Sequence, residues 1–217
     1  MELNILIVFL IIIVGTSIKA FNDAGFMEKW MFIPYLVNHE KQYYRIASHM
    51  AIHADWMHLI FNAMSLYFLG NAFLTFPMNV YVGIDGGLMA YYGPLMGQIH
   101  FGILFIVGGL FAALIPFVRH KDNPGYRSLG ASGAVSAVIF AAIMWNPEMR
   151  LSLFFIPIAI PAYIFGPLYL LFEFYMDKRG GSRIAHDAHI GGAIFGILYV
   201  LFINIDKGKE FLNVFFG

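Results

Sequence analysis

The chain has 217 residues, of which 60% are hydrophobic and only 12% are charged, and its mean hydropathy is +0.73. Soluble domains carry about 25% charged residues, so this composition favours a chain that lies in lipid. The formal net charge of zero argues against a basic surface for nucleic acid, and the absence of cysteine excludes disulfides, thiolate metal ligands and a cysteine nucleophile. We therefore predict one polytopic membrane domain over residues 1–217, with no nucleic-acid partner.

Apolar segments of membrane-spanning length recur along the chain. A bilayer core about 30 Å thick needs about 20 mainly apolar helical residues. Six segments approach this requirement, and they are 3–20, 57–76, 99–118, 131–146, 152–175 and 188–205. We expect an all-α bundle of six transmembrane helices. The first segment has no basic residues before it and no clear small-residue cleavage site, so we expect an uncleaved span and not a signal peptide.

The segments between the spans differ in character. Residues 21–56 are rich in aromatic residues and in charges of both signs, which predicts a long loop in the membrane interface. Residues 77–98 are rich in glycine and proline and contain one charge, Asp85. The sequence assigns no role to this second segment.

The fifth predicted span is unusual because it contains three prolines, Pro157, Pro161 and Pro167. Proline removes a helical hydrogen bond, and neighbouring helices must then satisfy the freed backbone groups. We predict that this kinked helix and the loop at 177–187 act as a lateral gate and a cap.

Polar residues stand near the start of three of the predicted spans. If the spans alternate in direction, the second, fourth and sixth enter the membrane from the same face. His58 and Asn62 lie near the start of the second, four residues apart and so on one helix face. Ser132 starts the fourth span and His189 starts the sixth. The sequence therefore predicts that these four residues lie at a similar depth.

Small residues follow two of these polar positions. They are Gly133, Ala137 and Ala141 after Ser132, and Gly192 and Gly196 after His189. Stripes of small residues let membrane helices approach closely. If the two stripes face each other, Ser132 and His189 meet near the start of both helices.

This set of side chains is typical of acyl transfer. A serine attacks a carbonyl only when a base takes its proton, and histidine is the usual base. His58, Asn62 and the backbone N–H of Ser132 offer donors for the developing oxyanion. Each residue alone has a simpler explanation: Ser132 as a packing residue, His189 as an interfacial residue, and Asn62 as a hydrogen bond between helices. Their joint placement favours catalysis, because polar and ionisable groups inside spans are costly.

The chain resembles the rhomboid family of intramembrane serine proteases in three motifs, which occur in the same order as in that family. "GASG" at 130–133 is similar to the Gly-x-Ser-Gly nucleophile motif of that family, and "AHIGGAIFG" at 188–196 is similar to its His-x-x-Gly-x-x-x-Gly motif. "HMAIHADWMHLIFN" at 49–62 resembles its histidine-rich entrance to the second helix. The resemblance implies a serine endopeptidase with Ser132 as nucleophile, His189 as base, and His58 and Asn62 as oxyanion donors, without a third acid.

The resemblance also implies roles around this site. It makes His49 and His53 braces of the first loop, Phe61 an aromatic near the substrate gate, and Tyr44-Arg45 a partial match to a Trp-Arg loop anchor. Where many members have a tyrosine that stacks on the catalytic histidine, this chain has Ser136. Asp187 precedes His189 by two residues, an angle of about 200° on a helix, so we expect it to point away from the site.

A zinc-dependent membrane hydrolase is an alternative, because His186 joins His49, His53, His58 and His189 in a set of five histidines. The sequence has no His-Glu-x-x-His pair, and we see no carboxylate inside a span near this set. We therefore predict no metal and no cofactor, with His186 as a solvated loop residue. A non-catalytic relative that binds membrane helices is a further alternative.

The resemblance implies transmembrane proteins as substrates, contact with membrane lipid, and a bacterial inner membrane location with the site facing outward. The basic residues conflict with this orientation. The face that carries the proposed site receives most of the lysines and arginines, and the positive-inside rule would turn this face to the cytoplasm. We follow the resemblance, and the sequence gives no prediction of oligomeric state.

Overall fold

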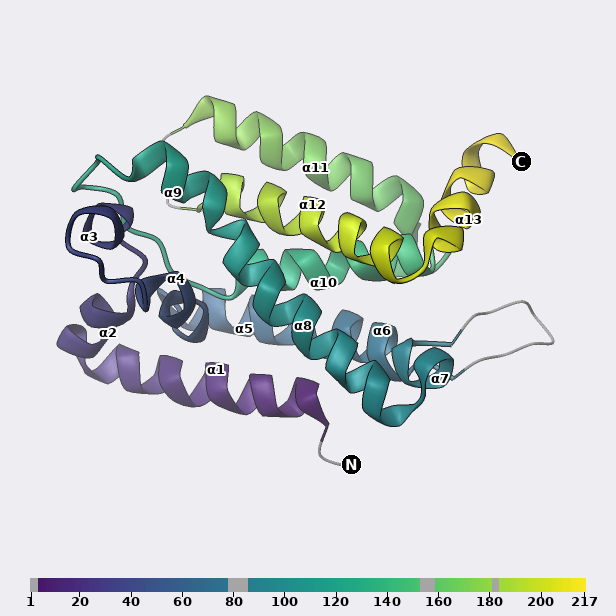
Figure 1. The fold of residues 1–217 in the computed structure, drawn as a ribbon, viewed down its shortest axis with the longest axis horizontal. Helices are drawn as coiled ribbons and strands as arrows, with labels where there is room; N and C mark the ends of the chain where they lie inside the picture. Colours follow the sequence, from purple (N-terminus) through teal and green to yellow (C-terminus); the bar gives the residue numbers. More distant parts are fainter. Residues whose placement is uncertain (1–3, 78–85, 153–158, 181–183) are drawn as a thin grey trace.

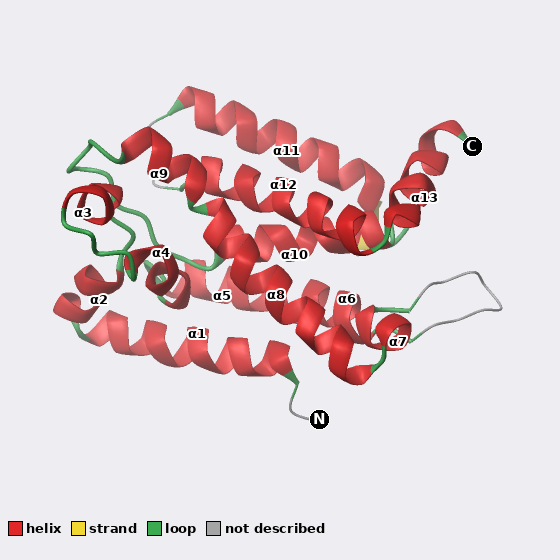
Figure 2. Ribbon diagram, in the orientation of Figure 1, coloured by secondary structure: helices red, strands yellow, loops and turns green. Residues whose placement is uncertain are grey.

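A computed structural model describes residues 4–77, 86–152, 159–180 and 184–217, and these form a bundle of helices that lie roughly along one direction (Figure 1). Helix α10 (Ser132–Trp145) lies inside the bundle, against α8 (Pro94–Ala112) and α12 (His186–Ile203). Helices α1 (Ile5–Asn22) and α11 (Ala162–Arg179) lie on opposite sides of it. Figure 2 shows that helices dominate the described part of the chain. The prediction of a mainly helical fold is confirmed, although two short strands are also present.

The described helices include four that are long and apolar enough to cross a membrane: Ile5–Asn22, Trp56–Thr75, Pro94–His120 and His186–Ile203. The prediction of six spans is therefore not confirmed. The apolar helix α10 has 14 residues, which is about 21 Å and shorter than a bilayer core. Helix α11 has 18 residues, but Glu173, Asp177, Lys178 and Arg179 lower its hydropathy.

Several predicted boundaries shift in the structure. The second span is built from α5 (Trp56–Ser65), the π-helical segment η2 (Leu66–Gly70) and α6 (Asn71–Thr75). The third starts earlier than predicted, with Pro94 in its first turn, and continues through α9 (Leu114–His120). Proline suits this position because the first turn of a helix needs no N–H donor.

The fifth predicted span is wrong at its start. Strands β1 (Arg150–Ser152) and β2 (Ala159–Pro161) pair antiparallel, and α11 begins only at Ala162. Pro161 therefore precedes the helix, Pro167 lies within it, and Pro157 lies outside the described residues. The predicted loop 177–187 is helical at both ends, since α11 continues to Arg179 and α12 begins at His186.

The predicted interfacial loop 21–56 folds into short helices at one end of the bundle, α2 (Ala24–Trp30), α3 (Pro34–His39), α4 (Arg45–Ser48) and the 3₁₀ turn η1 (His49–Ala51) (Figure 1). Arg45 is only 5% exposed. Its guanidinium donates to the carbonyls of Glu28 and Met31, each at 2.8 Å. Arg45 thus anchors this segment, while Tyr44 beside it is exposed.

Two further helices of the described residues fall outside the predicted spans. Helix α7 (Leu88–Tyr92) occupies part of the segment 77–98, and the indole of Trp145 donates to the nearby carbonyl of Gly86 at 2.9 Å. Helix α13 (Ile205–Phe216) follows α12 after Asn204, whose side chain caps it by accepting from the N–H of Asp206. The described residue Gly86, just before α7, therefore contacts the C-terminal end of α10.

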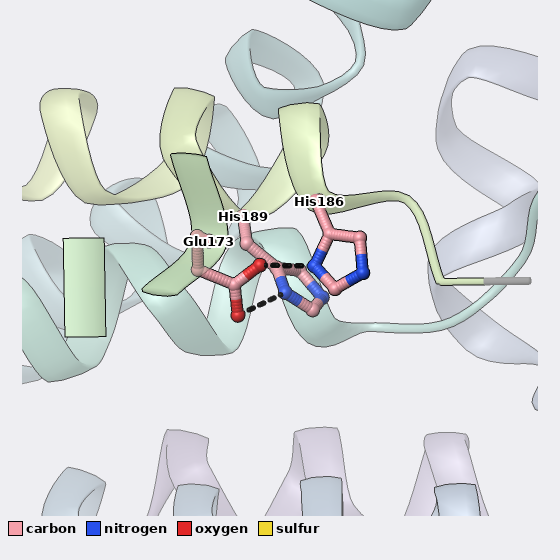
Figure 3. Close-up of side chains that lie close together, drawn as sticks. All are labelled: Glu173, His186 and His189. Carbon is pink, nitrogen blue, oxygen red and sulfur yellow. Dashed lines mark hydrogen bonds and ion pairs between the residues drawn. The ribbon is translucent and has the colours of Figure 1, made fainter. Parts of the chain in front are cut away.

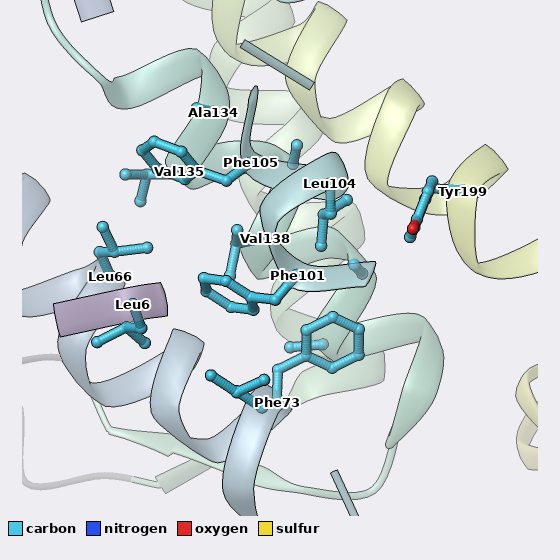
Figure 4. Close-up of a cluster of buried hydrophobic side chains, with 14 of the residues drawn as sticks. Leu6, Leu66, Phe73, Phe101, Leu104, Phe105, Ala134, Val135, Val138 and Tyr199 are labelled. Atoms are coloured by element: carbon cyan, nitrogen blue, oxygen red, sulfur yellow. The ribbon is translucent and has the colours of Figure 1, made fainter. Parts of the chain in front are cut away.

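The core changes in side-chain size across α10. Toward α1, α6 and α8 it is built from large apolar side chains, which Figure 4 shows as a cluster that includes Leu6, Leu66, Phe73, Phe101, Phe105 and Val138. The closest contact between α10 and α12, in contrast, is made by glycine and alanine. A Cβ atom added to Gly192 would collide with the carbonyl oxygen of Gly133, and one added to Gly196 would collide with that of Ala137. The predicted meeting of the two small-residue stripes is confirmed, and it sets the distance between α10 and α12.

Candidate active site

The loop before Ser132 is attached to the first loop by backbone hydrogen bonds. The N–H and carbonyl of Ser128 exchange bonds with Phe32, at 3.0 and 2.9 Å. The N–H of Gly130 donates to the carbonyl of His49 at 2.9 Å. Residues 128–131, which we call the nucleophile loop, are therefore placed by residues that lie 81 to 96 positions earlier in the chain.

His53 adds a side-chain support to this loop. Its imidazole is fully buried, Nε2 accepts the N–H of Ala131 at 3.3 Å, and Nδ1 lies 3.0 Å from the hydroxyl of Ser17. Burial, and then the neighbouring His58, lower the pKa of His53 to about 3. Burial also lowers the pKa of His49 to about 4, although Nδ1 of His49 is bonded to the carbonyl of Arg45 at 3.0 Å. Both imidazoles are neutral braces at physiological pH.

Ser132 is the first residue of α10 and is partly buried. Gly130 has a φ of 122°, in the region that favours glycine, and turns the loop into the helix. Ala131 at the N-cap offers no side-chain acceptor to the first helical N–H groups. The free N–H groups of a helix start favour negative charge. A cavity of about 20 Å³, enough for one water, borders Ser132 and Gly133.

His58 and Asn62 lie beside this loop on α5. A Cβ atom on Gly130 would lie 2.6 Å from Cε1 of His58, so the imidazole packs directly against the nucleophile loop. The rings of His58 and His53 are 4.9 Å apart. Asn62 is 7% exposed, and its Nδ2 donates to the carbonyl of His58 at 2.9 Å. An amide nitrogen carries two N–H bonds, and this contact uses one of them.

The start of α12 lies against the start of α10. A Cβ atom on Gly133 would lie 3.5 Å from the carbonyl oxygen of Ala188, so the residue after Ser132 contacts the residue before His189. The hydroxyl of Ser136 donates to the carbonyl of His189 at 2.9 Å. The structure thus brings together the helix starts that carry Ser132 and His189.

A buried carboxylate occupies the other side of His189 (Figure 3). Glu173 of α11 is 3% exposed, and its Oε1 lies 3.1 Å from Nδ1 of His189. Its Oε2 lies 2.6 Å from Nδ1 of His186. The hydroxyl of Tyr169 lies 3.4 Å from Nδ1 of His189. One carboxylate therefore bridges both histidines of the first turn of α12.

Two sequence predictions are corrected by this arrangement. His186 is not a solvated loop residue, because it starts α12 and is only 4% exposed. The expectation that no carboxylate stands near the histidines is wrong, because Glu173 contacts two of them. Asp187 does point away, as predicted, toward Arg119 at 3.5 Å.

The rhomboid-domain pattern matches residues 40–205, which is most of the chain. The chain belongs to the rhomboid family. It is 32% identical over 169 residues to RHOMBOID-like protein 12, mitochondrial, of Arabidopsis thaliana, covering 72% of this chain and 45% of that protein. It is 31% identical over 120 residues to the Presenilin-associated rhomboid-like protein, mitochondrial, of Bos taurus, covering 50% of this chain and 29% of that protein.

The rhomboid chain thus spans less than half the length of these relatives. Membership of the family supports an integral multi-pass membrane protein. The predicted bacterial inner membrane finds no support, since these relatives are mitochondrial by name.

The same three side chains on α11 and α12 could hold a metal ion. Ligand atoms of Glu173, His186 and His189 all lie within 4.8 Å of one another. Among the described residues, His49, His53 and His58 do not belong to such a cluster. Two nitrogens and one carboxylate oxygen suit zinc. The contacts of 2.6 and 3.1 Å are, however, those of direct hydrogen bonds between the carboxylate and protonated Nδ1 atoms.

Sequence reasoning named four candidate site residues in this rhomboid chain but did not include Glu173. A signal was present: Glu173 is a lone acid in the stretch "YLLFEFYM", residues 169–176. A carboxylate among aromatic and aliphatic residues is costly unless it is paired and usually has a function. The i, i+3 spacing of His186 and His189 is a second signal, because residues at this spacing lie on one face of a helix.

Proposed function

We propose that this rhomboid protein is an intramembrane serine endopeptidase that uses Ser132 and His189. The observation that carries the proposal is the contact between the starts of α10 and α12. It is supported by the pairing of Nδ1 of His189 with Glu173, which leaves Nε2 as the nitrogen that can accept a proton. Family membership supports the same reaction class.

In the proposed reaction the hydroxyl oxygen of Ser132 bonds to the scissile carbonyl carbon, and its proton moves to Nε2 of His189. The resulting oxyanion accepts hydrogen bonds from His58, Asn62 and the N–H of Ser132. The carbon–nitrogen bond then breaks as His189 gives its proton to the leaving amine. Water attacks the acyl carbon while His189 takes the water proton. The bond between the acyl carbon and the Ser132 oxygen then breaks, His189 returns the proton to Ser132, and the carboxylic acid product leaves.

The proposed substrates are transmembrane proteins, which a rhomboid domain within a membrane would meet. The predicted outward orientation of the site remains a prediction. Since the chain has no cysteine, a single cysteine in place of the exposed Asn123 would report the orientation. That residue follows α9 at the end of the bundle that holds the nucleophile loop. Labelling by an impermeant thiol reagent from the outer side would support the prediction.

Labelling with a fluorophosphonate probe in detergent tests the nucleophile. We expect the wild-type protein to be labelled, and Ser132→Ala to abolish labelling, because the probe bonds covalently to an activated serine. Ser136→Ala is the matched control, since Ser136 lies one turn further along α10 and donates to a backbone carbonyl. Equal labelling of wild type and Ser132→Ala would refute the proposal.

The two alternatives predict other outcomes. A zinc-dependent hydrolase using Glu173, His186 and His189 would contain stoichiometric zinc and would lose activity with a chelator. A non-catalytic helix-binding protein would bind a labelled transmembrane substrate without turning it over. Turnover that resists chelation and is lost in Ser132→Ala would exclude both.

A further inference from the structure

The bridge between α11 and α12 uses both oxygens of one buried carboxylate. Oε1 of Glu173 faces Nδ1 of His189, and Oε2 faces Nδ1 of His186, while Glu173 and His186 are each only 3–4% exposed. Figure 3 shows that the two rings approach the carboxylate from the same turn of α12. Burying a carboxylate away from water is costly, so this arrangement depends on both hydrogen bonds.

We infer that Glu173 is a positioning residue of the proposed protease: it fixes the tautomer and orientation of His189, and His186 holds the carboxylate in place. The inference rests on the proposed function. It extends the predicted serine–histidine dyad to a chain of four side chains, Ser132, His189, Glu173 and His186.

The first step of the argument concerns the proton on His189. A carboxylate has no hydrogen to donate, so Nδ1 of His189 must carry the proton in this contact. A neutral imidazole with a proton on Nδ1 has its lone pair on Nε2. That lone pair is what the base needs to accept the proton of Ser132. The opposite tautomer would present an N–H to the serine and could not act.

The second step concerns charge. When His189 accepts the proton of Ser132 it becomes an imidazolium, and the carboxylate of Glu173 stands 3.1 Å away from it. An opposite charge at this distance in a buried site favours the protonated base. Glu173 therefore stabilises His189 in the state that precedes departure of the amine.

The third step concerns His186. Its hydrogen bond to Oε2, at 2.6 Å, stops rotation of the carboxylate and leaves Oε1 directed at His189. His186 and His189 are on one face of α12, three residues apart, so both approach the same carboxylate. His186 thus acts on the proposed base through Glu173.

Glu173→Gln is the main test, and Asp177→Asn is its matched control. Asp177 is another acid on α11, paired with Arg119 at 2.8 Å, and it does not contact His189. We expect kcat for a transmembrane substrate to fall about 100-fold or more in Glu173→Gln with little change in KM, because the amide can hold the wrong tautomer. Asp177→Asn should stay within about 3-fold of wild type, and Glu173→Asp should recover part of the rate.

The pH dependence separates positioning from a purely structural role. Loss of the carboxylate charge should move the acid limb of the kcat/KM profile to lower pH in Glu173→Gln, while Glu173→Asp should keep the wild-type limb. A rate within 3-fold of wild type and an unchanged profile in Glu173→Gln would overturn the inference. So would stoichiometric zinc in the active protein that is lost in Glu173→Gln.

A measurement that does not depend on turnover tests the inference when a variant has no measurable activity. Nitrogen-15 NMR of the histidine side chains reports the tautomer of His189 directly, and it can be recorded in the Ser132→Ala background. We expect Nδ1–H in that background and a mixture when Glu173→Gln is added. His186→Phe, which keeps a buried ring but removes the donor, should lower kcat about 10-fold. A mixed tautomer already present beside intact Glu173 would overturn the inference, whereas loss of labelling at Ser132 alone bears on the proposed function.

Discussion

The two sides of the candidate site are built differently. The nucleophile side is held mainly by backbone hydrogen bonds, from Phe32 and His49 to residues 128–130, with the neutral ring of His53 as an additional acceptor. The base side is held by a charged side chain, because Glu173 reaches across from α11 to Nδ1 of His189. Ser132 is thus positioned by backbone hydrogen bonds to its loop, and His189 by a hydrogen bond to a charged side chain.

This difference matters for how each side responds to change. Backbone hydrogen bonds do not depend on the identity of most side chains, so we expect the nucleophile loop to tolerate substitution except at Gly130, whose φ is positive, and at the buried Ala131. The base side depends on one carboxylate and its two partners. Substitutions and pH changes should therefore affect the two sides differently, whereas loss of the contact between α10 and α12 should disrupt both.

The largest expected effect comes from a substitution that pushes α12 away from α10. In Gly192→Ala the added Cβ would meet the carbonyl oxygen of Gly133, so α12 must move away from the residue next to Ser132. We expect a loss of about 3 kcal/mol in the free energy of unfolding and loss of turnover, measured by denaturant titration in detergent and by substrate cleavage. Gly15→Ala is the control, since a Cβ there meets nothing within 4 Å. Equal stability of the two variants would contradict the packing described here.

A smaller effect concerns the nucleophile side alone, and it is measured as the pH dependence of the free energy of unfolding. The pKa of His53 is about 3 in the fold, below the unfolded value of about 6.5. The unfolded chain therefore binds a proton below pH 6.5 that the folded chain does not, so stability is complete above this pH and falls as pH decreases. At pH 5 the loss due to His53 is about 2 kcal/mol.

His53→Gln is the variant that tests this effect, because an amide can accept from Ala131 without titrating. Its unfolding free energy should fall by about 2 kcal/mol less than that of wild type between pH 8 and pH 5. The remaining slope of the variant should include His49, whose pKa is also lowered. Parallel stability profiles for the two proteins would show that His53 does not brace the loop in its neutral form.

The smallest effect tests the hydrogen bond that links the two sides. Ser136→Ala removes the donor to the carbonyl of His189, and such bonds between membrane helices contribute about 0.6 kcal/mol on average. We expect a stability loss of this size and a decrease in kcat of less than about 5-fold. A decrease approaching that of Glu173→Gln would mean that Ser136, and not Glu173, sets the position of His189.

The parts of the fold that follow from local pattern were predicted from the sequence. The apolar lengths of α1, α8 and α12, the small stripes on α10 and α12, and the placement of Ser132, His58 and His189 at helix starts all depend on residues close together in the chain. The rhomboid assignment followed from motifs of the same kind.

The rest depends on tertiary contacts. The start of α11 was wrong because two short strands pair before it, and this pairing has no strong periodic signal. Glu173 was missed because nothing in its own helix shows that two histidines of α12 lie opposite its carboxylate. His186 was wrongly predicted to lie in a solvated loop, because polar residues beside glycines are typical of loops. Its burial depends on the hydrogen bond to Glu173, a tertiary contact that the local sequence does not show.

Helix α11 carries the acid that faces His189, and a second link, from Arg119 to Asp177, attaches the same helix to α9. Both links are contacts between side chains, so the readiness of the proposed base depends on the position of α11. Moving α11 outward by one or two ångströms would leave Ser132 and the oxyanion donors in place but would release Nδ1 of His189. The chain would then hold an assembled but idle site, which becomes competent when α11 returns.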